Sequence, residues 1–310
     1  MEIISDNTDF ILPVRTVVSI GKFDGDHLGH QRIFEEMRAI KQKYGLKMAA
    51  FTFVYPGNKQ IASMGEKHLS LEDEGIDYLI EYPFTDEIRM TDGHEFLKNL
   101  LIDKMKMAWI VAGDDCSFGY NKSGNAELLR KFSSVYDYKV TIIQKIQFND
   151  TDISSTMIRQ LLSEGDVDRI YKVKGNYYSL SGQVEHYKNL GKKLGFPTAN
   201  ISPPGDKILP KPGVYATTTQ LEDGRVLSSM TNIGYNPTVC ESDITGIKCE
   251  THIFDFDEDI YGQIIKVAFI RFIREEKRFN SLDALKIQLQ KDKDVIKQCF
   301  NQNYMVKGET

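Results

Sequence analysis

The chain has 310 residues, of which 41% are hydrophobic and 27% are charged. This composition indicates a globular protein, excludes disorder, collagen and coiled coil as descriptions of the whole chain, and at this length predicts two domains. The 39 Lys and Arg against 44 Asp and Glu give a net charge of -5, which argues against a nucleic-acid or anionic-membrane partner held by bulk charge.

The first half alternates between strand and helix patterns. Short apolar runs predict strands at residues 17–20, 47–53, 78–80, 109–111 and 140–143. Between the first two strands, a helix carries Ile33, Phe34, Met37 and Ile40 on one face and ends near Gly45, and further helices are expected at 93–105 and 156–163. This repeated order predicts an α/β domain whose parallel sheet has helices on both faces.

The second half, from about Gly175, contains mainly strand and turn patterns. Residues 214–219 and 250–256 alternate, and residues 264–273 are apolar on both faces and should be buried, so we expect a small antiparallel barrel or sandwich. A last helix should begin after Ser281, a suitable N-cap, with Leu282, Leu285 and Leu289 on one stripe. The predicted domains are residues 1–175 and 176–310.

Two further features bear on location and redox state. The apolar stretches are too short to span a bilayer and the N-terminus lacks a signal-peptide layout, so we expect a cytoplasmic protein. The four cysteines lie far apart in the chain, without a C-x-x-C pair, which favours reduced thiols over a zinc site or a disulfide framework; they are Cys116, Cys240, Cys249 and Cys299.

The first chemical motif, residues 21–30, links a predicted strand to a predicted helix. Gly21, Gly25 and Gly29 would let the backbone approach a ligand closely, and a helix start of this kind suits phosphate. His27 and His30 are three residues apart, so both can donate hydrogen bonds to phosphoryl oxygens. The alternative is a loop with two solvent-exposed histidines, but H-x-G-H in this setting favours nucleotidyl transfer.

A second segment, residues 153–159, supplies Ser155 and Thr156 at a helix start and Arg159 one turn later, within reach of a triphosphate. With the H-x-G-H motif, it resembles the nucleotidyltransferase superfamily with a Rossmann-like fold, and most closely its FMN adenylyltransferases. Residues 75–78, 111–115, 118–119 and 124 extend the resemblance. It implies an ATP site made by Gly21, Phe23, Asp24, Gly25, His27, His30, Ser155, Thr156 and Arg159, with Asn121 and Asn125 as further candidates for nucleotide or flavin contact.

The second chemical motif, residues 195–200, follows a basic turn at 188–194. The Thr198 hydroxyl and the Asn200 carbonyl are hard oxygen ligands suited to Mg²⁺. The residues that could wrap a nucleotide phosphate are Gly191, Lys192, Lys193, Gly195 and Pro197. Taken alone, the segment is equally a charged surface turn beside a proline-stiffened loop.

The second half as a whole resembles riboflavin kinase. The matching segments follow one another in order: 181–184, 195–201, 210–216, 232–234, 237–238, 250–253, 255–256, 259–262 and 274–279. Together, the two halves resemble the bifunctional bacterial riboflavin kinase/FAD synthetase family over nearly the entire chain.

The resemblance implies two successive reactions with ATP as co-substrate and Mg²⁺ as the metal. The C-terminal domain would phosphorylate riboflavin to FMN, with Glu250 as the base and Thr198 and Asn200 as ligands of Mg²⁺–ATP. The N-terminal domain would join FMN to AMP and release pyrophosphate, giving FAD, with His27, His30 and Arg159 as its catalytic residues. The implied flavin pocket of the kinase contains Tyr261, Arg274 and Phe279. All implied partners are small molecules; the oligomeric state stays open.

Several residues depart from the family pattern. Asp26 replaces an aliphatic residue between Gly25 and His27, where a carboxylate would repel phosphate unless it binds Mg²⁺ or points away. The other departures are Tyr55, Gly57, Cys116 and Ser117 in the first half and Lys192 in the second. Two alternatives follow: a riboflavin kinase whose N-terminal domain is slow, altered in substrate or inactive, or a regulatory protein that binds flavin or nucleotide. The presence of Thr198, Asn200 and Glu250 argues against the second.

Overall fold

A computed structural model describes residues 1–310 except 6, 56, 187–190, 192–193, 236–246 and 307–310. The chain forms two compact units, Met1–Ser155 and Thr156–Thr310. The first is an α/β unit and the second a β-barrel with helices, as predicted. The helices α6 (Ser155–Glu164) and α7 (Val167–Lys174) group mainly with the barrel. The limits 1–175 and 176–310 for the functional domains stay a prediction.

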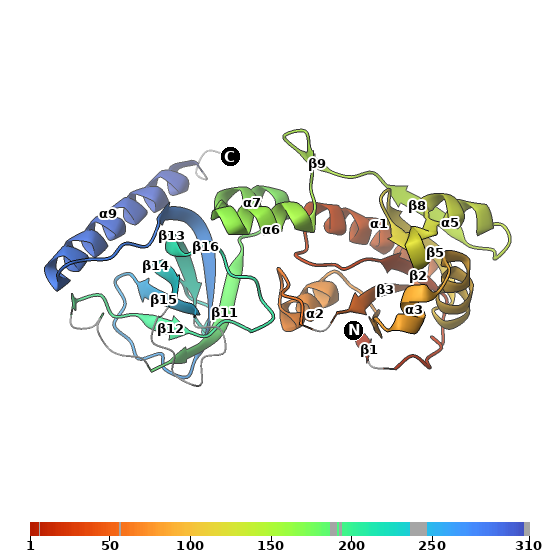
Figure 1. Cartoon of the computed structure of the whole chain (residues 1–310), viewed down its shortest axis with the longest axis horizontal. Helices are drawn as coiled ribbons and strands as arrows, with labels where there is room; N and C mark the ends of the chain where they lie inside the picture. The colour runs from red at the N-terminus through yellow and green to blue at the C-terminus, as the bar shows by residue number, and fades with distance from the viewer. Residues whose placement is uncertain (6, 56, 187–190, 192–193, 236–246, 307–310) are drawn as a thin grey trace. The chain divides into compact units, whose positions relative to one another are not determined.

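The first unit is built on a six-stranded sheet in the order β1-β4-β3-β2-β5-β8, and all neighbouring strands are parallel (Figure 1). The strands are β1 (Glu2–Ser5), β2 (Thr16–Ile20), β3 (Lys47–Val54), β4 (Tyr78–Pro83), β5 (Met107–Gly113) and β8 (Lys139–Ile143). Five of these strands were predicted. The sixth, β1, was missed because it is a short edge strand with little burial.

Helices cover both faces of this sheet, as predicted. On one face α1 (Leu28–Tyr44) and α2 (Met64–Asp73) pack over the sheet, and Phe34, Met37 and Ile40 are buried there. The other face carries α5 (Ala126–Phe132) and the π-helix η1 (Phe96–Lys104), which follows α4 (Gly93–Glu95) in the segment predicted to be helical. Because side chains alternate along a strand, consecutive β2 residues serve opposite cores.

Short elements surround the carboxyl ends of the strands. They are α3 (Asp86–Met90), β6 (Ser117–Phe118), η2 (Tyr120–Lys122), β7 (Gly124–Asn125), β9 (Gln147–Phe148) and β10 (Thr151–Asp152). The helix α1 ends where predicted, at Gly45, whose φ of 67° lies in the left-handed region.

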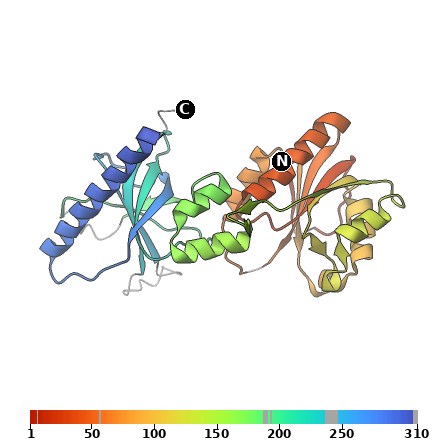
Figure 2. The same cartoon turned by 90° about the horizontal axis from the view of Figure 1, so that it is seen from above.

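The second unit contains a closed antiparallel barrel in the order β11-β12-β15-β14-β13-β16. Its strands are β11 (Ser179–Glu185), β12 (Ala199–Ile201), β13 (Gly213–Gln220), β14 (Val226–Tyr235), β15 (Ile247–Ile253) and β16 (Ile264–Arg274). The helix α9 (Leu282–Val306) runs along the outside of the barrel (Figures 1 and 2). The barrel alternative is therefore confirmed over the sandwich.

Two details of this unit differ from the sequence predictions. β16 is not buried throughout: Ile264 is 58% exposed at the start of the strand, because the outer face of a barrel strand meets solvent unless a helix covers it. Leu282 is likewise exposed, whereas Leu285 and Leu289 pack on the barrel. The Ser281 hydroxyl does accept a hydrogen bond from the Ala284 amide, which confirms the predicted N-cap.

Among the described cysteines, Cys116, Cys249 and Cys299 are free thiols, as predicted, and Cys240 lies outside the described residues.

Candidate active sites

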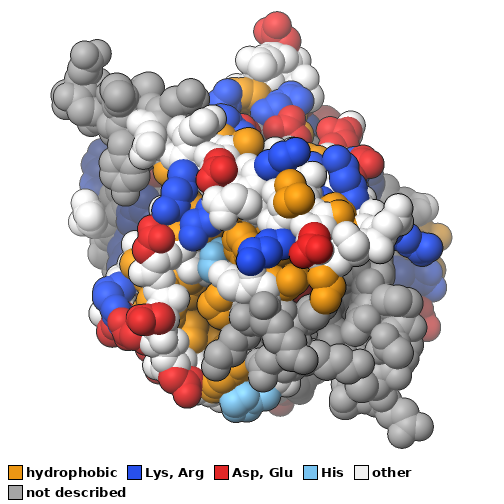
Figure 3. Space-filling view, turned by 90° about the vertical axis from the view of Figure 1, so that its left-hand side faces the viewer, with side chains coloured by type: hydrophobic (Ala, Val, Ile, Leu, Met, Phe, Trp, Pro, Cys, Tyr) orange, Lys and Arg blue, Asp and Glu red, His pale blue; other side chains and the backbone are white. Residues whose placement is uncertain are grey.

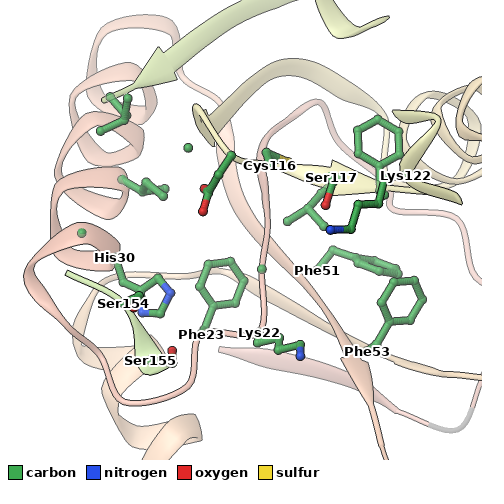
Figure 4. Close-up of a pocket in the computed structure, with 18 of the residues that line it drawn as sticks. Lys22, Phe23, His30, Phe51, Phe53, Cys116, Ser117, Lys122, Ser154 and Ser155 are labelled. Atoms are coloured by element: carbon green, nitrogen blue, oxygen red, sulfur yellow. The ribbon is translucent and has the colours of Figure 1, made fainter. Parts of the chain in front are cut away.

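The first unit contains a cavity of about 800 Å³ at the carboxyl ends of its strands. Ile20 of β2, Phe53 of β3, Gly113 of β5 and Ile143 of β8 all line it. This is the place where parallel α/β sheets bind ligands, and the volume suits a ligand of nucleotide or flavin size. Figure 4 shows His30 and Ser155 on one side of this cavity and Phe53 on the other.

The two histidines of the first motif stand together at the start of α1. Their rings stack with centroids 3.8 Å apart, and the edge of Phe23 packs against His30 at 5.5 Å. Both histidines line the cavity, although His27 is only 8% exposed. No acidic residue lies in the first turn of this 17-residue helix, so the positive end of its dipole and its first N–H groups favour an anion there.

Glycine at position 29 makes the placement of His27 possible. A Cβ atom at this position would lie 3.1 Å from two atoms of the His27 ring, closer than an unstrained contact allows. The ring therefore lies directly over the backbone of the first helical turn.

This close approach predicts that Gly29→Ala displaces the His27 ring and lowers the rate of the chemistry in this cavity about tenfold, since small displacements of catalytic groups are costly. The rate is to be compared with that of Gly65→Ala, a helical glycine whose added Cβ would meet nothing within 4 Å. Equal rates for the two variants would contradict the prediction.

The turn before α1 is held from behind by two hydrogen-bonded residues. Ser155 Oγ donates to the Asp24 carbonyl at 2.7 Å, which fixes the downstream motif against the first one. The Asp24 carboxylate is buried and accepts from the Ile61 amide at 2.7 Å. Of the predicted ATP contacts, Gly21, Phe23, His27, His30 and Ser155 thus line one cavity, whereas Asp24 and Gly25 shape the turn beneath it. Thr156 and Arg159 are exposed on α6.

Asp26, the unexpected carboxylate, is not among the residues that line the main cavity. Its Oδ2 accepts a hydrogen bond from Ser70 Oγ of α2 at 3.0 Å. A separate void of about 10 Å³ lies beside it, next to Lys67. Burial lowers the pKa of Lys67, whose Nζ donates to Thr52. The carboxylate therefore points towards α2 and not into the main cavity, so it is not placed to repel a phosphate bound there.

An aromatic wall, made of Phe53, Tyr55 and Phe84, forms another side of the cavity. The ring centroid of Phe84 lies 5.1 Å from that of Phe53 and 4.7 Å from that of Tyr55. Lys22 Nζ lies 5.5 Å from the Tyr55 ring, and burial raises the pKa of the Tyr55 hydroxyl. Sequence reasoning did not identify Phe84, because only the sheet order shows that the end of β4 lies beside the end of β3.

The remaining candidate residues of the first half lie in different places. Asn121, Cys116 and Ser117 line the cavity. Burial raises the pKa of Cys116 to about 12, so the thiol remains protonated and serves as a small apolar surface. Asn125 instead caps α5, where its Oδ1 accepts from the amides of Glu127 and Leu128 at 3.0 Å. Gly57 has a left-handed φ of 79° and no atom near its missing Cβ.

The barrel unit contains a second, smaller cavity of about 310 Å³. Pro197, Thr198 and Ala199 form one side, and the loop at residues 256–261 forms another. The Tyr261 ring stacks on His186 with centroids 3.6 Å apart. Upstream, position 191 has room only for glycine, because a Cβ atom there would lie 2.3 Å from the Phe196 carbonyl oxygen. Gly195 has a left-handed φ of 82°, and Lys192 and Lys193 lie outside the described residues.

The predicted metal ligand Asn200 and the predicted base Glu250 lie on neighbouring strands. In the barrel ladder, Glu250 of β15 pairs with Asn200 of β12 on one side and Asn232 of β14 on the other. Directly paired residues project from the same face of a sheet, so the Glu250 and Asn200 side chains are neighbours. Glu250 is half-buried.

Asn200 has the geometry of a cation ligand. Its Nδ2 points to Thr198, 3.3 Å from the carbonyl and 3.4 Å from Oγ1, and its Oδ1 is buried with no hydrogen-bond partner among the described residues. A buried carbonyl oxygen without a donor suits a hard cation such as Mg²⁺. In the described part of the chain, no three His, Cys, Asp or Glu side chains form a metal-binding group.

Of the three predicted flavin contacts of the barrel, Arg274 and Phe279 lie near each other, and Tyr261 lies apart from them. Arg274 forms an ion pair with Asp292 of α9 at 2.7 Å and lies 5.9 Å from the Phe279 ring, whereas Tyr261 lines the small cavity with Thr198. The Asp292 side chain is 3% exposed. Sequence reasoning missed Asp292, although a carboxylate on the same helix stripe as Leu285 and Leu289 indicates a buried charge with a partner. Figure 3 shows Lys and Arg side chains bordering hydrophobic ones on the face that it draws.

Comparisons with known proteins agree with this division. A family model described as FAD synthetase matches residues 12–157, and one described as riboflavin kinase matches residues 174–300. A bifunctional riboflavin kinase/FMN adenylyltransferase of Buchnera aphidicola is 33% identical over 92% of this chain and 94% of its own. The enzyme of the same name from Haemophilus influenzae is 32% identical with the same coverage.

A solved structure also matches nearly the whole chain. It is described as a macrolide-efflux protein from Streptococcus pneumoniae, has a TM-score of 0.84 and 30% sequence identity, and the match covers 95% of this chain and 98% of that one. Within the residues described here, none of the helices has the length and apolar character needed to cross a membrane.

Proposed function

The chain belongs to the family of bifunctional riboflavin kinase/FMN adenylyltransferases, and from this membership we propose where in the molecule each reaction takes place. The enzyme phosphorylates riboflavin to FMN and adenylylates FMN to FAD, with ATP as co-substrate of both steps. We assign FAD formation to a domain of residues 1–175 and FMN formation to residues 176–310. One observation supports this most: each family model covers one unit, and each unit has its own cavity lined by residues of the matching motif.

In the adenylyltransferase cavity, the attacking group is already an anion, so no strong base is needed. A phosphate oxygen of FMN attacks the α-phosphorus of ATP, the new P–O bond forms, and the bond to the β-phosphate breaks as pyrophosphate leaves. His27, His30 and the N-terminus of α1 stabilise the charge that develops on the α-phosphate of the transferred adenylyl group and on the leaving pyrophosphate. Ser155, Thr156 and Arg159 are the further predicted phosphate contacts.

The aromatic wall gives this cavity a surface for the flavin ring. Phe84 packs edge to face against Phe53 and at a tilt against Tyr55, and rings of this kind offer a flavin both apolar contact area and favourable ring–ring contacts. Figure 4 places Phe53 across the cavity from His30, so a flavin on the wall would extend its phosphate towards the histidines. This supports an active adenylyltransferase despite the departures at Asp26, Tyr55 and Cys116.

In the kinase site, Glu250 accepts the proton of the riboflavin 5′-hydroxyl as its oxygen attacks the γ-phosphorus of ATP and ADP leaves. Thr198 Oγ1 and Asn200 Oδ1 would hold Mg²⁺, which would neutralise charge on the phosphates of ATP. The pairing of Glu250 with Asn200 across β15 and β12 places the proton acceptor beside the metal ligands. Arg274 and Phe279, next to α9, are proposed as contacts of the flavin. Tyr261 is proposed to contact the ligand that binds in the smaller cavity.

Asn200→Leu removes the orphaned carbonyl oxygen at similar volume. We expect the Mg²⁺ concentration for half-maximal FMN formation to rise about tenfold or more, because a lost oxygen ligand weakens a weakly held hard cation. The Mg²⁺ dependence of FMN adenylylation in the same protein should be unchanged, which provides the control. An unaltered Mg²⁺ curve for FMN formation would exclude Asn200 as a ligand.

The function is tested by incubating the protein with riboflavin, ATP and Mg²⁺ and resolving the flavins by chromatography. FMN followed by FAD is the expected result. FMN alone would indicate a kinase with an impaired N-terminal domain. Unchanged riboflavin that binds tightly would favour the regulatory alternative.

A further inference from the structure

Of the two predicted Mg²⁺ ligands, Asn200 lies within β12, whereas Thr198 lies in the turn just before this strand, outside the β12–β15 ladder. The β12–β15 pairing runs from Ile201↔Cys249 to Ala199↔Thr251 and stops there. Pro197 lacks an N–H group and so cannot donate a further ladder bond. Backbone pairing between these strands thus leaves the first part of the turn, Pro197 and Thr198, unanchored.

A side chain of β15 supplies the missing anchor. His252 Nδ1 lies 2.8 Å from the Pro197 carbonyl oxygen. A carbonyl oxygen only accepts hydrogen bonds, so Nδ1 carries the hydrogen and donates. Thr198 is itself linked to Asn200 through the amide Nδ2, so the position of the Pro197 carbonyl is transmitted to both ligands.

The imidazole is fixed in this orientation by its surroundings. His252 is 6% exposed and packs between Phe196 and Phe254, with ring centroids 5.2 and 5.6 Å away. Burial lowers the pKa of His252, and Lys293 and Lys297 of α9 act in the same direction against the opposing effect of Asp255 and of the Pro197 carbonyl. Whatever its charge, the ring donates to Pro197 as long as Nδ1 carries its hydrogen, and the packing of the two phenylalanines keeps Nδ1 directed at that carbonyl oxygen.

We propose that His252 is a positioning residue of the kinase site, and that its hydrogen bond to the Pro197 carbonyl holds Thr198 and Asn200 in place for Mg²⁺–ATP. This inference rests on the proposed location of the kinase site at Thr198, Asn200 and Glu250. Its role differs from that of Glu250, because His252 acts through the turn and not on the reacting atoms.

A matched pair of substitutions tests the proposal. The amide nitrogen of an Asn side chain can take the place of imidazole Nδ1, whereas that of Gln reaches the place of Nε2. We expect His252→Asn to keep the KM for ATP within about twofold of the original protein. His252→Gln and His252→Ala should raise the KM for ATP in FMN formation about tenfold, as expected for the loss of one hydrogen bond, and leave the KM for riboflavin unchanged.

Conversion of supplied FMN to FAD by each variant serves as the control for an intact protein, because it takes place in the other unit. Equal KM values for ATP in the Asn and Gln variants would overturn the proposal, as would a fall in kcat alone or a parallel rise in the KM for riboflavin. If His252→Ala does not fold, the Asn and Gln pair still decides. Failure of the unsubstituted protein to make FMN would overturn the proposed function itself, a result distinct from any difference among the variants.

Discussion

Glu250→Gln is expected to lower the rate of riboflavin phosphorylation by a factor of about 10² to 10⁴, the contribution typical of a general base. Gln keeps the size of the side chain but cannot accept the proton of the 5′-hydroxyl. Glu250 stands in the strand ladder between Asn200 and Asn232, and Gln has nearly the same shape, so the substitution should leave the predicted metal ligands in place. Conversion of added FMN to FAD should continue at the original rate.

The measurement is FMN formation from riboflavin at saturating ATP and Mg²⁺. Glu222→Gln is a suitable matched control, because Glu222 also lies in the barrel unit and its side-chain oxygen accepts a hydrogen bond from the Ile264 amide, which a Gln carbonyl oxygen can still accept. Full kinase rate in Glu250→Gln would remove Glu250 as the base. A loss of equal size in Glu222→Gln would indicate a general effect on the fold.

The second large effect is expected in the first unit. Replacement of either His27 or His30 by Ala should lower FAD formation from FMN by a factor of about 10² to 10³, the usual loss when one donor to a developing oxyanion is removed. The two rings stack at 3.8 Å, so removal of one also frees the other. The double variant should therefore lose less than the product of the two single effects.

His68→Gln provides the control for this pair of substitutions. His68 is also a histidine of the first unit, but it contacts Glu81 through Nε2 at 2.9 Å and does not line the main cavity. A Gln amide nitrogen can take the place of that Nε2, so FAD formation should be preserved. Retained activity in His27→Ala and His30→Ala, or equal loss in His68→Gln, would contradict the assignment.

The parts of the site that the sequence predicted are those encoded by contiguous residues. His27, His30 and Gly29 belong to one turn, so their spacing already places them at the start of a helix. The end of that helix at Gly45 follows from the same local chemistry, since glycine adopts a left-handed φ without strain.

Features that depend on pairs distant in sequence could not be predicted in this way. Asp26 is drawn away from the cavity by Ser70, which is 44 residues further along the chain. The aromatic wall needs the ends of β3 and β4 to be neighbours, which only the sheet order establishes. Tyr261 and Arg274 were both predicted to contact flavin, yet the strand β16 separates them, and Tyr261 lines the small cavity while Arg274 pairs with Asp292 of α9.

The most direct test of two separate active sites mixes two defective variants, Glu250→Gln and the His27→Ala/His30→Ala double variant, with riboflavin, ATP and Mg²⁺. Each has one intact site, so neither alone should make appreciable FAD from riboflavin. The mixture should make it, because FMN released by the double variant can enter the intact cavity of the other protein. Formation of FAD from riboflavin by either variant alone, or its absence from a mixture in which supplied FMN is still converted, would contradict this account.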